Sequence, residues 1–272
     1  METPQSSTQD HHHYSESTKN WVEVQELLRS RLILADDFTW RLPTTREEPK
    51  EDQALREKLK YVGGVDLSFS KEDPSIACGA LIVVDLNNDM NIVYEDFSVV
   101  KLQIPYIPGF LGFREAPVLV KLLEKMKSEA HPFYPQLLMV DGNGILHPQG
   151  FGLACHLGVL SGLPTIGIGK NLHHVDGLTQ SGVRQSLEAE ENSTRDLIIL
   201  TGHSGHTLGA AMRSTHDSLK PIFISTGHRV SLDTAIKIVE MTCKYRIPEP
   251  IRQADIRSRA FLQKHPASTR IT

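Results

Sequence analysis

The sequence predicts an α/β domain built on one mixed sheet, in which antiparallel strands come before parallel ones. Three segments rich in Val, Ile and Leu come first, and only a few polar residues separate them. Such short loops favour antiparallel pairing, because a parallel crossover needs a dozen or more residues. Further along, buried strands alternate with helices, which is typical of a parallel α/β arrangement.

The elements are predicted in order from their periodicity. Apolar residues at helical spacing predict a first helix over Trp21–Leu34. The three antiparallel strands are expected at Tyr61–Phe69, Ile76–Leu86 and Ile92–Leu102. An alternation of helix and strand should follow at Arg114–Glu129, Leu137–Val140, Leu153–Leu160 and Pro164–Ile168. The last strands and the two closing helices are expected at Leu197–Leu200, Leu208–Met212, Ile222–Ser225, Leu232–Lys244 and Ile251–Lys264.

This order of strands and helices matches a ribonuclease-H-like fold. The polar segment Thr179–Thr194 predicts a loop. We expect three regions in the chain: a disordered tail over residues 1–19, a single domain over 20–265 and a short tail over 266–272.

The composition is that of a globular protein and argues against several other classes. The chain of 272 residues is 39% hydrophobic and 23% charged, as in ordinary globular proteins. It has no apolar run long enough for a membrane span. Three widely spaced cysteines argue against a disulfide framework and a zinc site. Reduced thiols predict an intracellular protein. We expect it in the cytoplasm, the nucleus or both, the nucleolus included.

The charge is unevenly distributed along the chain. The net charge of −4 is a mild argument against phosphate binding, yet seven Lys and Arg fall between Lys244 and Arg270 against two acids, Glu249 and Asp255. A local basic patch of this kind can bind phosphate inside an acidic protein. A solvated helix face is the alternative interpretation, and charge alone favours it.

Three acidic residues lie at positions where an active site is expected. Asp66 lies among the apolar residues of the first strand, and Asp141 ends the central strand just before Gly142. If these strands are neighbours, the two aspartates lie side by side, and Glu115 at the start of a helix can reach them. Carboxylates this close repel one another, and a hard divalent cation such as Mg²⁺ relieves the repulsion. Ordinary roles, a loop cap or a favourable place at a helix dipole, are the alternatives.

Several motifs together resemble the endonuclease V family. They are Gly63-Gly64-Val65-Asp66, the run Pro105 to Leu111, Phe113-Arg114-Glu115, Val140 to Gly144, His147 to Gly152, Gly227-His228-Arg229 and the run Tyr245 to Asp255. The last run is similar to animal members. The resemblance extends from about Trp21 to about Leu262 and is weakest over Thr179–Thr194.

This resemblance implies roles for individual residues. Asp66 and Asp141 would hold Mg²⁺, which Mn²⁺ could replace, and Glu115 would be the catalytic glutamate. The other catalytic residues implied are Asp255, His228 and Lys170, where Lys170 would contact phosphate. For His228, a role near the metal and a helix-capping role carry equal weight. For Lys170, the alternative is a solvated loop lysine.

The resemblance also implies how the substrate is bound. Tyr106, flanked by Pro105 and Ile107, would act as a wedge where a base is pulled out of its stack. As a separate hypothesis from the residues, the loop Gly142–Gly152, including Asn143, Gly144 and Gly150, has few side chains and could offer backbone N–H donors to hypoxanthine. The glycines could equally serve turn geometry.

The substrate that the family resemblance implies is inosine-containing single-stranded RNA, with deoxyinosine-containing DNA as a second candidate. The cut would fall at the second phosphodiester bond 3′ of inosine. We expect a monomer that does not bind membranes. Two alternatives remain: a ribonuclease-H-like nuclease without inosine specificity, and a non-catalytic inosine-binding protein.

Overall fold

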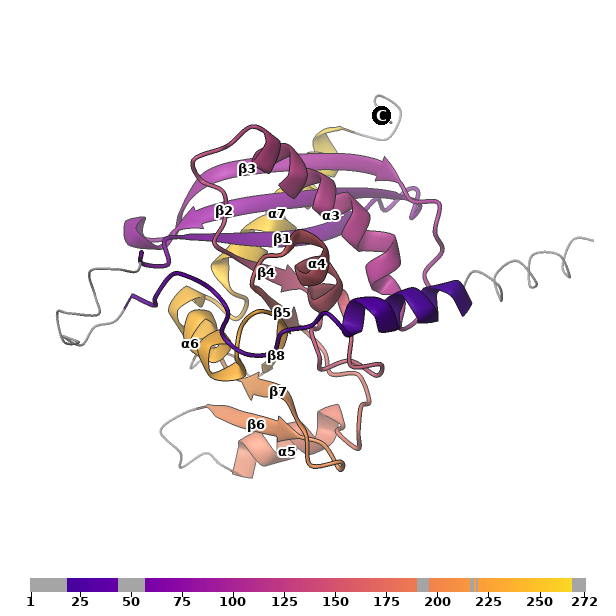
Figure 1. Ribbon diagram of the computed structural model, residues 1–272, viewed down its shortest axis with the longest axis vertical. Coiled ribbons are helices and arrows are strands. Elements are labelled where there is room, and N and C mark those ends of the chain that lie inside the picture. The colour runs from indigo at the N-terminus through magenta and orange to yellow at the C-terminus, as the bar shows by residue number, and fades with distance from the viewer. Residues whose placement is uncertain (1–18, 44–56, 190–195, 216–217, 219, 266–272) are drawn as a thin grey trace, which may run out of the picture.

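One eight-stranded sheet organises the chain in the order β3-β2-β1-β4-β5-β8-β7-β6 (Figure 1). The computed structural model describes residues 19–43, 57–189, 196–215, 218 and 220–265. The strands are β1 (Tyr61–Phe69), β2 (Ile76–Asp85), β3 (Asn91–Lys101), β4 (Leu137–Asp141), β5 (Thr165–Gly169), β6 (Leu197–Thr201), β7 (Thr207–Met212) and β8 (Ile222–His228). The expected tails over 1–19 and 266–272 lie outside the described residues, apart from residue 19.

The pairing of the strands follows the predicted plan. β1, β2 and β3 form an antiparallel meander, while β1, β4 and β5 run parallel to one another. β8, β7 and β6 then extend the sheet with antiparallel pairs. The prediction of a mixed α/β sheet with an antiparallel part followed by a parallel part is therefore confirmed.

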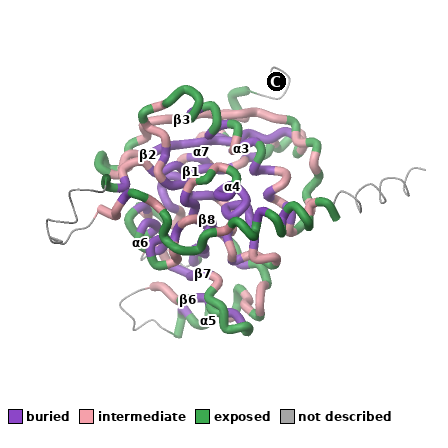
Figure 2. Tube along the Cα trace, viewed as in Figure 1, coloured by how far each residue is buried: buried purple, intermediate pink, exposed green. Residues whose placement is uncertain are grey.

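Helices cover both faces of the sheet (Figure 1). α3 (Leu111–Ser128) and α4 (Leu153–Ser161) pack on one face, and α6 (Leu232–Thr242) and α7 (Glu249–Lys264) pack on the other. Successive strand residues point to opposite faces. Accordingly Val65 packs with the α3 side, whereas Val62 packs with the α7 side. Buried chain is concentrated in the central strands (Figure 2).

A glycine in β1 brings α7 unusually close to the sheet. A Cβ placed on Gly64 would lie 2.1 Å from the backbone carbonyl of Pro250, near the start of α7. No side chain fits in that space, so only glycine allows this approach. The contact fixes the first turn of α7 against β1, and the following turns pass over the end of that strand.

The segment predicted to be a polar loop contains a helix. α5 (Gln180–Ala189) occupies most of the span Thr179–Thr194, and residues 190–195 lie outside the described residues. Val183 and Leu187, four residues apart, are buried against β6 and β7. Two apolar residues on one face are enough for packing, although the composition is polar. The N-terminal helix covers residues 19–29, so it ends before the predicted Leu34.

No described helix combines the length and the apolar character that crossing a bilayer requires. All three cysteines are free thiols, and Cys78 and Cys155 are buried.

Candidate active site

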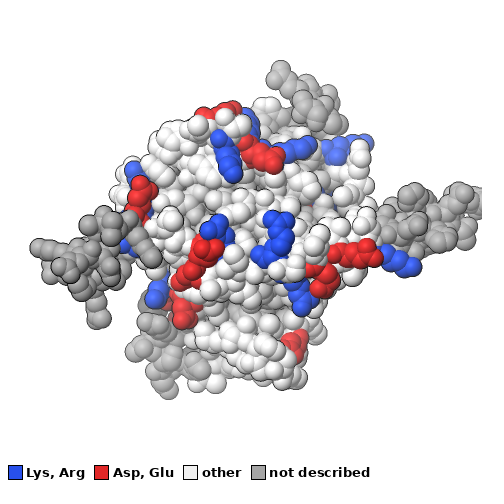
Figure 3. Space-filling view, in the orientation of Figure 1, with Lys and Arg blue, Asp and Glu red and all other residues white. Residues whose placement is uncertain are grey.

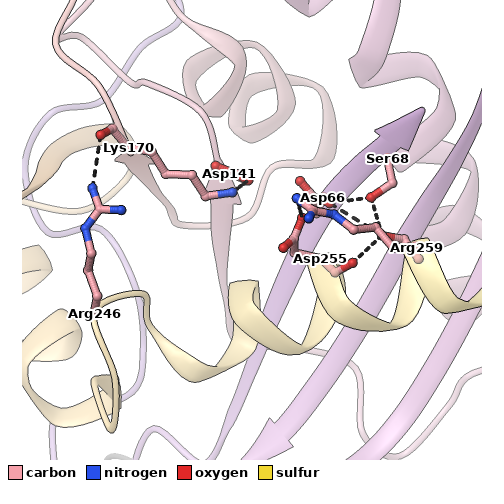
Figure 4. Close-up of polar contacts among 8 residues, drawn as sticks. Asp66, Ser68, Asp141, Lys170, Arg246, Asp255 and Arg259 are labelled. Atoms are coloured by element: carbon pink, nitrogen blue, oxygen red, sulfur yellow. Dashed lines mark hydrogen bonds and ion pairs between the residues drawn. The ribbon is translucent and has the colours of Figure 1, made fainter. Parts of the chain in front are cut away.

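The strand register brings the two predicted aspartates together. Val65 of β1 pairs with Val140 of β4, so Asp66 and Asp141 occupy the next positions of two adjacent parallel strands. Val65 and Val140 both face α3 and α4, so Asp66 and Asp141 both point toward α7. They line one end of a cleft of about 700 Å³. Figure 4 shows both side chains above α7.

α7 completes the acidic end of the cleft with Asp255 and a buried hydroxyl. Asp255 lines the cleft beside the two strand aspartates. Ser258, fully buried one turn later, lies 2.7 Å from the Ser68 hydroxyl and 3.5 Å from Asp66 Oδ2. Ser68 Oγ also donates to Asp66 Oδ2 at 3.2 Å. The two hydroxyls fix the orientation of the Asp66 carboxylate, a role that the sequence did not reveal.

Lys170 supplies a positive charge at the same place. It follows β5, and its Nζ lies 2.5 Å from Asp141 Oδ2. Burial opposes the charged ammonium, but the carboxylate of Asp141, helped by Asp66 and Asp255, raises the pKa of Lys170 above its usual value. The structure therefore places the half-buried Lys170 in the acidic cluster.

Arg246 ties the backbone of Lys170 to the rest of the fold (Figure 4). Its guanidinium donates to the carbonyl of Lys170 at 3.1 Å, and to those of Lys220 and Pro221 at 3.0 Å. One side chain thus joins the loop after β5 to the segment that leads into β8. Arg246 belongs to the quoted run Tyr245 to Asp255, but its role became apparent only from the structure.

Glu115 approaches the aspartates from the other face of the sheet. It lies in the second turn of α3 and is buried. Burial and then the charge of Asp66 raise the pKa of Glu115 to about 8. Burial and then the charge of Asp141 raise the pKa of Asp66 to about 7. The three predicted acids therefore lie close enough for the charge of Asp141 to oppose the ionisation of Asp66, and for both aspartates to oppose that of Glu115.

The chemistry of these acids fits a hard divalent cation. Asp66 and Asp141 offer oxygen ligands at one end of an open cleft, and their mutual repulsion would be relieved by a cation. Across the described part of the chain, no three acidic, His or Cys side chains form a ready-made metal cage. Asp141 contacts Lys170, and Asp255 contacts Arg259 at 2.7 Å. Mg²⁺ suits such a site because it keeps several waters and needs only one or two carboxylates.

A second, smaller cavity lies next to the cleft. It has a volume of about 170 Å³, and it lies between the start of α3 and the loop after β4. Tyr106, 60% exposed, lines it together with Gly142 and Asn143. Asp141 lines the cleft and Gly142 lines the cavity, so consecutive residues contribute to the walls of both.

The predicted backbone donors of the loop need a correction. The N–H groups of Gly142 and Gly150 donate to the carbonyls of Ile168 and His147, and that of Gly144 donates to the hydroxyl of Ser225. These three groups therefore do not face a base. A Cβ on Gly144 would lie 2.0 Å from the carbonyl oxygen of Thr226, so close packing explains this glycine.

His228 does not join the acids. It ends β8 opposite Thr165, which begins β5, whereas Lys170 follows the other end of β5. The length of that strand, about 13 Å at 3.3 Å per residue, therefore separates His228 from the cleft. Its Nδ1 accepts a hydrogen bond from the N–H of Ile33. Ser231, not His228, caps α6. Neither predicted role of His228 agrees with this geometry.

The basic residues near the C-terminus are largely paired with acids. Arg252 forms two hydrogen bonds to Glu249, and Arg257 and Lys244 pair with Glu95 and Asp89. This supports the solvated-face interpretation over a free basic patch. On the face over α3 and α4, Lys and Arg are interspersed with Asp and Glu (Figure 3).

Comparisons with known proteins identify the family. The model of the Endonuclease V family matches residues 44–256. The chain belongs to the endonuclease V family. It is 42% identical to mouse Endonuclease V over 249 residues, covering 92% of this chain and 70% of that protein. It is 41% identical to the human protein, covering 92% and 84%.

Solved structures of endonuclease V agree in fold. The catalytic domain of human Endonuclease V superposes with a TM-score of 0.81 at 40% identity, covering 92% of this chain and 97% of that one. Ciona intestinalis Endonuclease V, bound to a DNA containing an inosine followed by a ribo-adenosine, gives a TM-score of 0.80 at 34% identity, covering 92% and 98%. As a member of this family, the protein is a nuclease that hydrolyses phosphodiester bonds.

Proposed function

We propose that the protein is a Mg²⁺-dependent endonuclease that cuts single-stranded RNA at the second phosphodiester bond 3′ of inosine. The observation that carries this proposal is the pairing of Asp66 and Asp141 on adjacent parallel strands, at the junction of a cleft and a small cavity. The Ciona relative was crystallised with inosine-containing DNA, which supports inosine as the recognised base. Mn²⁺ is expected to replace Mg²⁺.

The two aspartates, Glu115 and Lys170 would each have a different part in the chemistry. Asp66 and Asp141 would hold the cation, which when bound polarises a phosphate oxygen and lowers the pKa of a water. Glu115, with its pKa near 8, is suited to exchange a proton with the attacking water. Lys170 is placed to contact a phosphate oxygen that approaches Asp141.

The small cavity would hold the inosine base. Hypoxanthine carries a carbonyl at position 6 and lacks the 2-amino group of guanine, so a tight pocket can exclude guanine on size. The wall includes Asn143, whose side-chain amide would rotate to accept a hydrogen bond from the N1–H of hypoxanthine. An acceptor there is mismatched to adenine, which carries no hydrogen at N1. Tyr106 would fill the space that the extruded base leaves.

The arrangement of the cleft and the small cavity supports the proposed position of the cut. The base cavity and the acids adjoin through Gly142 and Asp141, so they lie side by side without coinciding. An inosine in the cavity therefore places a phosphate further along the strand at the acids. A cut one nucleotide beyond the inosine is consistent with this offset.

The preference for RNA over DNA depends on contacts to the 2′-OH. The ligand of the Ciona relative is a DNA with a ribo-adenosine after the inosine, which directs attention to the sugar at that position. We propose that a ribose there is enough for efficient cleavage. A monomeric state and a cytoplasmic or nuclear location remain predictions.

Cleavage of matched oligonucleotides tests the proposal. The set contains one inosine in RNA, in DNA and in DNA with a single ribonucleotide after the inosine, and guanosine replaces inosine in each control. We expect one Mg²⁺-dependent cut 3′ of inosine that EDTA abolishes. Equal cutting of the guanosine strands would favour a nuclease without base choice. Tight binding without any cut would favour an inosine-binding protein.

A further inference from the structure

The cleft continues well beyond the acids. Asp66, Asp141 and Asp255 line its inner end, and its outer part is bounded by the end of β1 and the last turns of α7. Gly142, the residue after Asp141, lines the small cavity. A strand that enters from the cavity and crosses the acids therefore reaches the outer cleft next. The catalytic residues already described do not account for this part of the surface.

Phe69 gives the outer cleft an aromatic surface. It is the last residue of β1, it lines the cleft, and it is 38% exposed. The guanidinium of Arg114 lies 5.0 Å from the centre of its ring. A single exposed Phe is common on protein surfaces. A Phe that lines the cleft of a nuclease is different, because nucleic-acid bases stack on such rings whatever their sequence.

Further charged and polar groups line the same cleft. Lys71 follows Phe69 after one residue, and Arg259 and Gln263 face the cleft from successive turns of α7. Ser70 Oγ accepts hydrogen bonds from two N–H groups of the same loop, at 3.2 and 3.4 Å, and this helps to fix the backbone next to Lys71. Glu72 adds one negative charge to the same lining. An aromatic ring with cations nearby suits a nucleotide, which combines an apolar base face with a phosphate.

We propose that the outer cleft binds the nucleotide immediately 3′ of the cut, with its base stacked on Phe69 and its phosphate near Lys71. This inference rests on the proposed function, since it requires the strand to run from the base cavity across the acids. That nucleotide is the second one after the inosine. Its stacking would hold the scissile phosphate against Asp66 and Asp141 whatever its base identity.

A coupling experiment tests the contact directly. The substrates are an inosine-containing RNA and its twin with an abasic residue immediately 3′ of the cut. Wild type and Phe69→Ala are compared on both under single-turnover conditions with Mg²⁺. Loss of one base–aromatic stack is expected to slow the wild type about tenfold on the abasic strand. Phe69→Ala should be slowed about tenfold on the intact strand, and the abasic residue should slow it no further.

Two controls separate stacking from general damage. Phe69→Leu keeps an apolar side chain at the end of β1, so it should fold like the wild type, have an unchanged melting temperature and still lose the abasic sensitivity. An abasic residue two nucleotides 5′ of the inosine should slow wild type and Phe69→Ala equally. Lys71→Ala should weaken binding of the intact and the abasic strand to a similar extent, because it would contact phosphate.

The outcomes distinguish this inference from the proposed function. If the wild type cuts the inosine strand but ignores the downstream base, only the outer-cleft proposal is overturned. Independent, multiplying losses from Phe69→Ala and the abasic residue would also overturn it. If the wild type fails to cut any inosine strand, the proposed function falls and this inference falls with it.

Discussion

The cleft and the small cavity are built in different ways. The acids of the cleft stand on core strands and on α7, and the buried hydroxyls of Ser68 and Ser258 hold Asp66. The small cavity is lined mainly by the loops around residues 105–112 and 142–153, and Tyr106 is largely exposed. A rigid sheet suits groups whose spacing must not change during the reaction. Loops suit the reading of a base, where shape can vary without disturbing the sheet.

This contrast predicts that changes in the cleft lower the rate, and that changes in the cavity alter which strand is chosen. The sharpest test in the cleft is Asp141→Asn, which keeps the shape of the side chain and removes its charge. We expect cleavage to fall by about a thousandfold, because cation-assisted stabilisation contributes several kcal/mol. Single-turnover cleavage of inosine RNA measures this effect.

Binding provides the control for Asp141→Asn. The affinity for inosine RNA should stay within a few fold of the wild type, because the small cavity is untouched. Measuring affinity by fluorescence anisotropy in EDTA avoids cleavage by the wild type. An equal loss of binding and cleavage would contradict the separation of catalysis in the cleft from base binding in the small cavity.

The next largest effect is expected at Lys170. Lys170→Ala removes the positive charge beside Asp141 and should lower single-turnover cleavage about a hundredfold, typical of a lost electrostatic contact in an active site. Arg246→Ala leaves the ammonium in place but removes the bonds to the Lys170 carbonyl, so a smaller loss is expected. Lys170→Arg retains the charge and serves as the matched control. Cleavage by Lys170→Ala at the wild-type rate would assign Lys170 a structural role only.

The sequence predicted the cleft, whose acids lie on core strands, better than the small cavity, which loops line. Strand periodicity located β1 and β4, and an acid within each apolar strand was a visible signal for Asp66 and Asp141. The hydroxyl of Ser258 carried no such signal, because its partner Ser68 lies 190 residues away in the chain. Local sequence does not determine contacts of that kind.

The failed predictions have the same origin. His228 was grouped with the acids by motif resemblance, but the antiparallel pairing of β8 with β5 places it at the opposite edge. The loop glycines looked like donors to a base, but Ser225 and other partners on distant strands use their N–H groups. α5 was missed because two buried residues gave too weak a periodic signal in a polar segment.

In the cavity, Tyr106→Ala tests the wedge. Losing one aromatic stacking surface should raise KM for inosine RNA about tenfold and leave the single-turnover rate at saturation nearly unchanged. Tyr106→Phe keeps the ring and should behave like the wild type. A fall in the saturated rate with KM unchanged would mean that Tyr106 acts in catalysis. It would contradict the division between catalysis in the cleft and base binding in the small cavity.

The smallest expected effect is on the stability of the folded protein. It can be measured without any substrate and depends on the buried acids. The pKa values of Asp66 and Glu115 are raised to about 7 and about 8 in the folded protein, far above their ordinary values. Between about pH 4 and pH 8 the folded state therefore holds protons that the unfolded chain has released. Stability that is present at low pH is lost as the pH rises through these values.

Melting temperatures in EDTA should accordingly fall between pH 5 and pH 8, by about 2–4 °C for each kcal/mol lost. Glu115→Gln removes one titrating acid and should flatten this fall. The proposed Mg²⁺ site requires the ionised carboxylates of the folded state, so Mg²⁺ should raise the melting temperature more at pH 8 than at pH 5. Asp141→Asn should lose most of this Mg²⁺ effect, whereas Tyr106→Ala should retain it. A Mg²⁺ effect equal in all these variants would mean that the cation binds outside the cleft.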